Sequence, residues 1–358
     1  MATTNPAVLL RRPSLLRRLP VVRQVRQSVG VQRFMLVTGL VITVIFVLVA
    51  VLAPLIAPYG FSQLRDAHGS FGSQQPPGHG HLWGTTVGGY DVFSRVIWGA
   101  QTAIMVIIIA VALSIFAGVL LGLISGYFGG WLDRVLVVVC DAIYAFPSLL
   151  LAIVMSIVIS GGQSSLWGGV MAAAISITVV YIPQYFRVIR SEAVRIKAEA
   201  YVESAKVVGA SNARIMFRHV YRNSTRTLPL IFTLNSSEAI LTLAGLGFLG
   251  FGIEPTAAAE WGFDLNKAIA DVTAGIWWTA LFPGVAIVLV VLGITLVGES
   301  LNDLADPRLR GRRAVGGTSG GIAETSAVPG GVLDAGPGGL AGLEGEGTID
   351  PEGIQVRP

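Results

Sequence analysis

The chain has 358 residues, of which 53% are hydrophobic and only 13% are charged, and its mean hydropathy is +0.69. A soluble domain carries roughly a quarter of charged residues, so this composition excludes an ordinary soluble protein. The net charge of +4 does not predict nucleic-acid binding, because the basic residues lie in a few short segments and are not spread over a surface. The single cysteine, Cys140, excludes an internal disulfide.

Six windows of the sequence are long and apolar enough to cross a bilayer, which takes about 20 residues. In chain order they are residues 34–54, 102–126, 135–160, 166–186, 228–253 and 276–298. The first window exceeds the apolar length of a cleaved signal peptide and is predicted to be an uncleaved anchor. Pro183, near the end of the fourth window, is tolerated in a membrane helix. We therefore predict an all-α polytopic membrane protein with six transmembrane helices.

The basic residues predict how the chain is oriented. Of the 25 lysines and arginines, 22 fall on one side of a six-span arrangement, which is then the cytoplasmic side and holds both termini. This gives a basic N-terminal segment (1–33), a first transmembrane helix (34–57), an external loop (58–101), a core membrane domain of five helices (102–310) and a glycine-rich tail (311–358). A second, shorter external loop covers residues 254–275. The tail is expected to be disordered, and the N-terminal segment is expected to lie against anionic lipid.

The most informative segment is the cytoplasmic stretch 187–226. Strong helix formers run through 191–208, Gly209 interrupts them, and Ser211 or Asn212 is placed to cap a second helix that begins at Ala213. Because both ends of this stretch enter membrane windows, it cannot reach far from the bilayer. We interpret it as a short docking surface for a cytoplasmic partner.

Several short sequence motifs resemble those of a known family. Glu203-Ser204-Ala205, then Gly209, then 218–223 (RHVYRN) resemble the EAA signature of permease subunits of binding-protein-dependent ABC transporters. Other motifs, between about residues 35 and 312, resemble those of the C-type permease of dipeptide and oligopeptide importers. They are 81–85 (HLWGT), 91–95 (DVFSR), 126–131 (GYFGGW), 145–148 (AFPS), 248–252 (FLGFG), 261–262 (WG), 281–284 (LFPG) and 306–310 (DPRLR). Ser204 and Arg222 depart from the signature, where the family has Ala and usually Pro.

The resemblance implies a type I ABC importer permease fold in the bacterial cytoplasmic (inner) membrane. It implies import of di- or oligopeptides by alternating access, in a complex with a paralogous B-type permease, two ATP-binding subunits and an extracytoplasmic peptide-binding protein. The residues that it assigns to coupling with the ATPase are Glu203, Ser204, Ala205, Gly209, Ala210, Arg218 and His219. The chain has no Gly-Lys-Ser or Gly-Lys-Thr phosphate loop, so ATP and Mg²⁺ are expected on partner subunits, with no cofactor or metal bound directly.

Acidic residues within apolar windows are costly and mark candidate pathway positions. We name Glu238, with the neighbouring Asn235 and Ser236, and also Asp141; the alternative is a structural role. His68, His79 and His81 have no third ligand at a fixed spacing and do not predict a metal site. Three other functions stay open: a permease for a non-peptide solute such as a nickel chelate or glutathione, a secondary transporter, and an intramembrane enzyme using Asp141 and Glu238.

Overall fold

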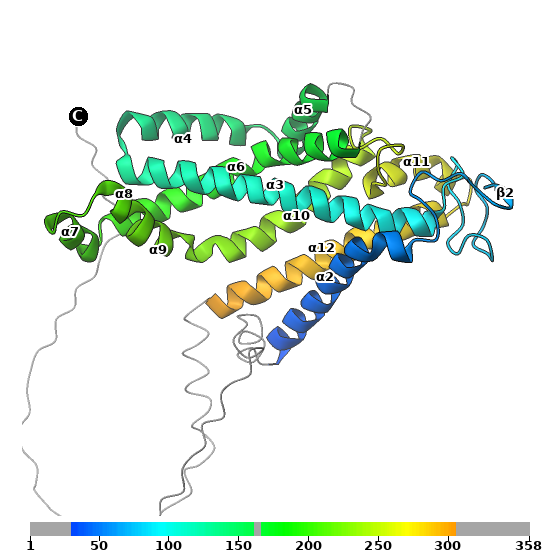
Figure 1. The fold of residues 1–358 in the computed structure, drawn as a ribbon, viewed down its shortest axis with the longest axis horizontal. Coiled ribbons are helices and arrows are strands. Elements are labelled where there is room, and N and C mark those ends of the chain that lie inside the picture. The colour runs from blue at the N-terminus through cyan, green and yellow to red at the C-terminus, as the bar shows by residue number, and fades with distance from the viewer. Residues whose placement is uncertain (1–29, 161–165, 306–358) are drawn as a thin grey trace, which may run out of the picture. The chain divides into compact units, whose positions relative to one another are not determined.

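The computed structural model describes residues 30–160 and 166–305 (Figure 1). The predicted disordered tail and nearly all of the basic N-terminal segment lie outside these ranges. The described chain is built of helices, and its strands β1 (Arg65–Asp66) and β2 (Gly69–Ser70) form only a small antiparallel hairpin. The prediction of an all-α protein is confirmed.

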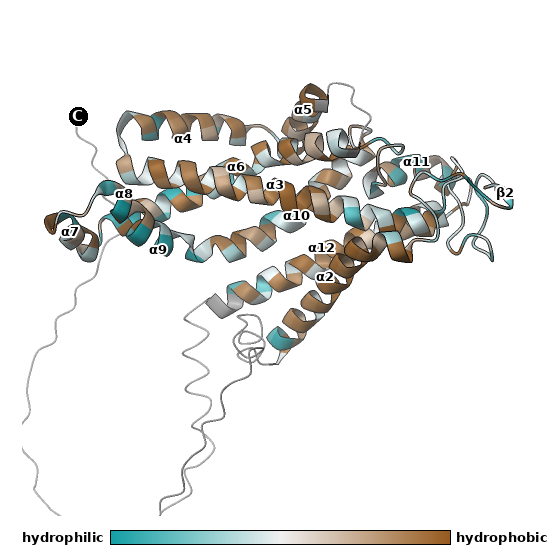
Figure 2. Cartoon of the chain, viewed as in Figure 1, coloured by the Kyte–Doolittle hydropathy of each residue, from teal (hydrophilic) through white to brown (hydrophobic). Residues whose placement is uncertain are grey.

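Within residues 30–160 and 166–305, five stretches are long and apolar enough to cross a membrane. They are α2 (Val31–Ile56), α3 (Val92–Phe128), α6 (Leu166–Lys197), the run Asn212–Phe248 that ends in α10 (Leu228–Phe248), and α12 (Trp278–Ala305). A sixth span exists only if α4 (Gly130–Ala145) and α5 (Ser148–Ser160) are counted together, because the pair is bent by 98°. Figure 2 shows that apolar residues dominate these helices, whereas hydrophilic residues gather around α8 and α9.

The bend in the third predicted window has a local cause. Phe146 is extended (φ −79°, ψ 141°) and precedes Pro147. Proline disfavours the helical conformation of the residue before it, so the helix ends at Ala145 and a new one starts at Ser148. The window predicted as one straight helix is therefore two helices.

Two further helices differ from the sequence prediction. Helix α3 begins ten residues before the predicted window, because the Asp91 carboxylate caps it by accepting from the Ser94 N–H at 2.7 Å. With about 1.5 Å per residue, its 37 residues exceed the bilayer core. The predicted external loop 254–275 contains a helix, α11 (Trp261–Thr273), whose N-terminus is capped by Glu260.

The bundle is held together by close packing of α3 on α6. Small residues Ser114, Gly118, Gly122 and Gly126 recur every four positions along α3 and face α6. At Gly122 an added Cβ would lie only 2.7 Å from the Phe186 carbonyl oxygen. Helix backbones approach closely at such small-residue stripes, which fixes α6 against the C-terminal half of α3. Helix α12 packs against both α2 and α10.

Candidate functional site

The predicted docking segment follows α6 as a helix, a glycine turn and a second helix. Helix α7 (Ala200–Val207) is followed by its C-cap residue Val208 and then by Gly209, where φ is +85°. The Ala210 N–H donates to the Ala205 carbonyl at 3.0 Å, and the Gly209 N–H donates to the Lys206 carbonyl at 2.9 Å. This pair of bonds is the Schellman motif, which places a left-handed residue directly after a helix. Glycine adopts that conformation without steric penalty, so the sequence fixes the turn.

The second helix begins at Asn212, one residue before the predicted Ala213, with Ser211 as its cap. The Ser211 hydroxyl accepts from the Arg214 N–H, and α8 (Asn212–Ile215) continues into a π-helical turn, η2 (Met216–Tyr221), and then α9 (Arg222–Ser224). The first helix differs from the prediction of a continuous run through 191–208. Helix α6 ends at Lys197, and α7 starts only at Ala200, so the segment forms a separate helical hairpin.

One face of this hairpin is anchored to the membrane helices. Val202, Ile215 and Val220 are fully buried. They belong to a cluster with Val119, Leu123 and Tyr127 of α3 and Ile189, Ala193 and Ile196 of α6. The Tyr127 hydroxyl also donates to the Asn212 side-chain oxygen at 2.9 Å. The hairpin is therefore packed directly against both α3 and α6.

The opposite face of the hairpin is exposed. Val207 and Val208 are 87% and 88% exposed, and nothing lies within 4 Å of a Cβ added at Gly209. An apolar tip of this kind, beside exposed polar groups, is typical of an interaction surface. Gly209 was predicted from the sequence but the two valines were not, although two adjacent β-branched residues before a glycine turn are a visible sequence signal.

The predicted coupling residues divide between the two faces. Glu203, Ser204 and Arg218 are exposed, together with Gly209. Ala205 and Ala210 pack against the buried cluster, and His219 is half-buried with its ring 6.2 Å from that of Tyr201. The structure thus brings these residues onto one hairpin, where the alanines help to anchor it and Glu203, Ser204, Gly209 and Arg218 are exposed.

The predicted pathway residues are not brought together in the same way. Glu238 lies at the middle of α10 and is exposed, on a stripe with Leu234 and Leu241. Asn235 and Ser236 are each only 3% exposed and face the interior of the bundle.

Asp141 lies on α4, where it accepts from the Arg187 guanidinium at 2.8 Å. Both side chains of this pair are about half exposed. Within the described part of the chain, no hydrogen bond or ion pair joins Asp141 to Glu238. The alternative of an intramembrane enzyme requires Asp141 and Glu238 to act as a pair, and the described contacts do not support such a pair.

A second group of candidate site residues, which are buried and charged, lies around the loop between α2 and α3 (the α2–α3 loop, residues 57–91). Arg95 of α3 is 1% exposed and binds Asp264 of α11 through Nε and Nη2, at 2.7–2.9 Å. Its Nη1 donates to the Phe61 carbonyl at 2.9 Å. One buried guanidinium therefore joins the α2–α3 loop, α3 and α11.

Glu260 is buried beside this ion pair. Its carboxylate accepts from the N–H groups of Gly262 and Phe263 at 2.8 and 2.9 Å. Burial nevertheless raises the pKa of Glu260 to about 8, because the two hydrogen bonds only partly offset the loss of hydration. The sequence analysis did not name Glu260, since it precedes a helix that was predicted as a loop.

His81, one of the three loop histidines, has a specific partner. His81 is 7% exposed, and its Nδ1 lies 2.9 Å from Asp91 Oδ1. In the ranges that the structure describes, no group of three or more His, Cys, Asp or Glu side chains is arranged to hold a metal ion. His81 thus fixes the loop to the residue that caps α3.

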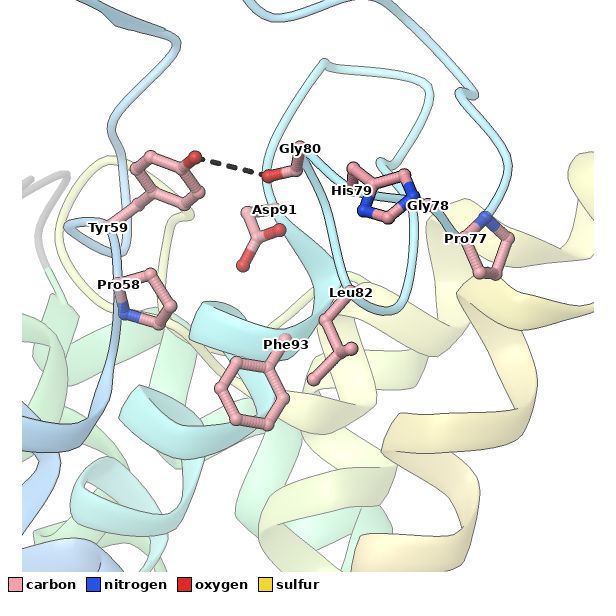
Figure 3. Close-up of a pocket in the computed structure, with 9 residues that line it drawn as sticks. All are labelled: Pro58, Tyr59, Pro77, Gly78, His79, Gly80, Leu82, Asp91 and Phe93. Carbon is pink, nitrogen blue, oxygen red and sulfur yellow. Dashed lines mark hydrogen bonds between the residues drawn. The ribbon is translucent and has the colours of Figure 1, made fainter.

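Beside this pair lies an open cavity of about 620 Å³ (Figure 3). Tyr59 crosses one side, its hydroxyl donating to the Gly80 carbonyl at 3.1 Å, while Leu82 and Phe93 form the floor that Figure 3 displays. The loop that lines the cavity and α11 lie at one end of the bundle, and α7 of the Gly209 hairpin lies at the other (Figure 1).

Two family matches cover most of the chain. Residues 118–311 match the binding-protein-dependent transport system inner membrane component, and residues 33–77 match the N-terminal transmembrane domain of oligopeptide transport permease C.

Curated relatives match over most of their own length. The chain is 34% identical over 274 residues to the dipeptide transport system permease protein DppC of Alkalihalophilus pseudofirmus, covering 76% of this chain and 86% of the relative. It is 36% identical over 291 residues to a putative peptide transport system permease protein of Brucella suis, covering 81% and 93%. It is 34% identical over 280 residues to the glutathione transport system permease protein GsiD of Escherichia coli, covering 78% and 88%. With its all-α bundle, this chain belongs to the family of binding-protein-dependent transport system inner membrane components, the permease subunits of ABC importers.

Proposed function

We propose that this chain is the C-type permease subunit of a bacterial ABC importer that moves di- or oligopeptides across the cytoplasmic membrane. The names of the dipeptide and peptide transport relatives support this cargo. The distribution of basic residues supports cytoplasmic termini. ATP and Mg²⁺ would be bound by two partner ATPase subunits, since this chain carries no phosphate-binding loop.

The exposed tip of the hairpin is the observation that carries this proposal. Val207, Val208 and Gly209 form a protrusion on which a partner subunit can close, while Val202, Ile215 and Val220 anchor it to α3 and α6. When the ATPase pair closes on ATP, the tip would move with it. Because the anchoring cluster is close-packed, the movement would tilt α3 and α6 rather than bend the hairpin. Alternating access then follows from re-tilting these helices.

The pathway would lie between this chain and a paralogous B-type permease. Glu238 supports this arrangement, because an ionised side chain facing lipid is costly whereas one facing a water-filled path is not. Its exposure together with Leu234 and Leu241 leaves a face of α10 for the path and the second permease. A peptide-binding protein would deliver cargo at the end that carries the α2–α3 loop.

Glutathione is the second candidate cargo. The relatives named as glutathione transport permeases are as similar to this chain as the dipeptide transport relative, at 34% identity. Glutathione is itself a small peptide, so the two cargoes share charged ends and differ in size and in the thiol.

The test is uptake by the reconstituted complex. Proteoliposomes that hold both permeases, the ATPases and the binding protein should accumulate a labelled dipeptide. They should do so only when ATP is present on the side of the membrane where the ATPases are bound. Preference for labelled glutathione would select the second cargo, and uptake without ATPases would contradict the proposal.

The hairpin is tested in the same system. The double substitution Val207→Ser with Val208→Ser should weaken ATPase association, because it removes the apolar tip without touching buried residues. Leu64→Ser, which changes a 43% exposed leucine in the α2–α3 loop, is the matched control and should leave association intact. Equal association in all three proteins would exclude this hairpin as the docking site.

A further inference from the structure

A second, smaller cavity lies between the α2–α3 loop and α11. Its volume is about 150 Å³, and its lining includes Thr86 and Tyr90 of the loop, Phe263 and Asp271 of α11, and Thr279 of α12. A single water needs about 10–15 Å³ by the same measure. The cavity therefore has room for several waters or for one small organic group.

Asp271, one of the residues that line this cavity, has a buried carboxylate oxygen without a partner. Asp271 is only 1% exposed. Its Oδ1 accepts from the Gln74 side-chain amide at 2.6 Å, but its Oδ2 is buried with no hydrogen-bond partner in the described structure. A neutral amide does not neutralise the carboxylate, and a buried charge is retained in proteins when it is paired or binds a ligand. Asp271 thus lacks a cation.

The other charged groups around the cavity do not supply that cation. Arg95 is committed to Asp264 through two of its nitrogens. Lys267 lines the cavity but is exposed, and its ammonium lies over the Phe263 ring, 5.2 Å from the ring centroid. In the described structure no ion pair joins Lys267 to Asp271.

The walls of the cavity are suited to a cation. Tyr90 already has the Arg95 guanidinium 4.9 Å from its ring centroid, and Phe263 has the Lys267 ammonium. Aromatic faces attract cations through the ring quadrupole. Asp271 also lies in the last turn of α11, where the helix dipole favours positive charge.

We propose that this cavity binds a primary ammonium group, with Asp271 as its counter-ion and the α-amino end of a peptide as its occupant. The occupant rests on the peptide cargo proposed above. A peptide amino terminus would enter between Tyr90 and Phe263 and donate to Asp271 Oδ2, leaving the rest of the peptide outside the small cavity. The site is separate from the Glu238 face of α10 and would hold one end of a peptide beside the α2–α3 loop.

The experiment is protection of a cysteine at the cavity. Val87 lines the cavity and is 50% exposed, and the chain has a single native cysteine, the buried Cys140. In a Cys140→Ala background, Val87→Cys is labelled with a maleimide in the complex held in nanodiscs, where both faces are accessible. Triglycine is the probe, and N-acetyl-triglycine, which lacks the ammonium, is its control. At about ten times its Kd, triglycine should leave about one site in ten free and slow labelling about tenfold.

Two substitutions test Asp271 itself. Asp271→Asn should abolish the protection, whereas Glu254→Gln, which removes a charge from an exposed neighbouring position, should retain it. Because Asp271→Asn could disturb folding, Lys267→Met provides a test at an exposed residue. Removing the competing ammonium should strengthen protection by triglycine.

The outcomes separate this inference from the proposed function. Equal protection by both peptides, no protection, or protection that persists in Asp271→Asn would overturn the ammonium site. Unchanged or weaker protection in Lys267→Met would also count against it. The labelling needs neither ATP nor transport, so normal dipeptide uptake without protection would contradict the ammonium site alone. Protection without uptake would instead contradict the proposed function in peptide import.

Discussion

Arg95 and Asp264 lie 169 positions apart in the sequence and form a buried ion pair with a closest contact of 2.7 Å. The pair joins the first turn of α3 to α11, and the same guanidinium donates to the Phe61 carbonyl of the α2–α3 loop. It therefore sets the position of the α2–α3 loop against two helices that the sequence separates widely.

Removing one partner of this pair should destabilise the protein strongly. Asp264→Leu leaves the Arg95 guanidinium buried without its counter-ion, and such changes cost about 3–5 kcal/mol. The double substitution Arg95→Met with Asp264→Leu should recover part of this loss, because no buried charge is left uncompensated. The midpoint of thermal unfolding in detergent measures both effects. A double variant less stable than Asp264→Leu would contradict this view of the pair.

Glu260 should make stability depend on pH. Burial raises its pKa from 4.5 to about 8, so between these values the folded state holds a proton that the unfolded chain releases. The stability gained from the neutral carboxyl is fully present below pH 4.5 and is lost as the pH rises to about 8. The loss is at most about 1.4 kcal/mol per pH unit.

Unfolding midpoints measured from pH 5 to 9 test this dependence. Glu260→Gln cannot ionise and should flatten the profile, whereas the exposed Glu254→Gln should keep the wild-type profile. Wild-type and Glu260→Gln profiles of the same slope would show that Glu260 does not titrate in this range.

Parts of this architecture could be predicted from the sequence because they depend on local patterns. Apolar length located the membrane helices, and Gly209 with Ser211 located the turn and the cap of the hairpin. Helical periodicity also separates Ser236 from Glu238, since two residues at about 100° each place them on nearly opposite sides. Local patterns do not reach further: the Arg95–Asp264 pair and the unpartnered Asp271 depend on contacts between distant segments, which no single window of sequence contains.

The orientation of the chain is tested by labelling from each side. In the Cys140→Ala background, Gln75→Cys should react with a membrane-impermeant reagent added outside cells. Val208→Cys, which replaces an 88% exposed side chain, should react only after the cytoplasmic face is opened. The expectation follows from the 22 of 25 basic residues assigned to the cytoplasmic side. Labelling of both positions from outside would contradict the six-span arrangement.

Glu238→Gln should change transport without loss of the complex. The side chain is exposed, so neutralising it leaves no buried partner unsatisfied. If it contacts cargo in the path, the lost charge-assisted hydrogen bond is worth about 1.5–3 kcal/mol, which is about tenfold or more in the KM for uptake. Asp141→Asn, which breaks a half-exposed pair with Arg187, is the control and should change uptake little. Unchanged KM in Glu238→Gln would remove it from the path.

Gly209→Val should uncouple ATP hydrolysis from import. Valine at φ +85° is a strained conformation that costs about 1–3 kcal/mol, and its branched side chain would stand at the tip on which the partner closes. Uptake per ATP hydrolysed is measured in the reconstituted complex and should fall, while membrane levels of the protein stay near normal because no membrane helix depends on this turn. Glu203→Lys should act in the same direction, since it reverses a charge beside the tip.

The matched control for this prediction is Gly275→Val. Gly275 has φ +83° and, like Gly209, nothing within 4 Å of an added Cβ, so valine there introduces the same backbone strain. It follows α11, at the opposite end of the bundle from the hairpin. If strain alone were responsible, both variants would lose coupling equally. Loss confined to Gly209→Val and Glu203→Lys, with coupling retained in Gly275→Val, is the result expected of an ATPase contact at the hairpin, and wild-type coupling in all three would exclude that contact.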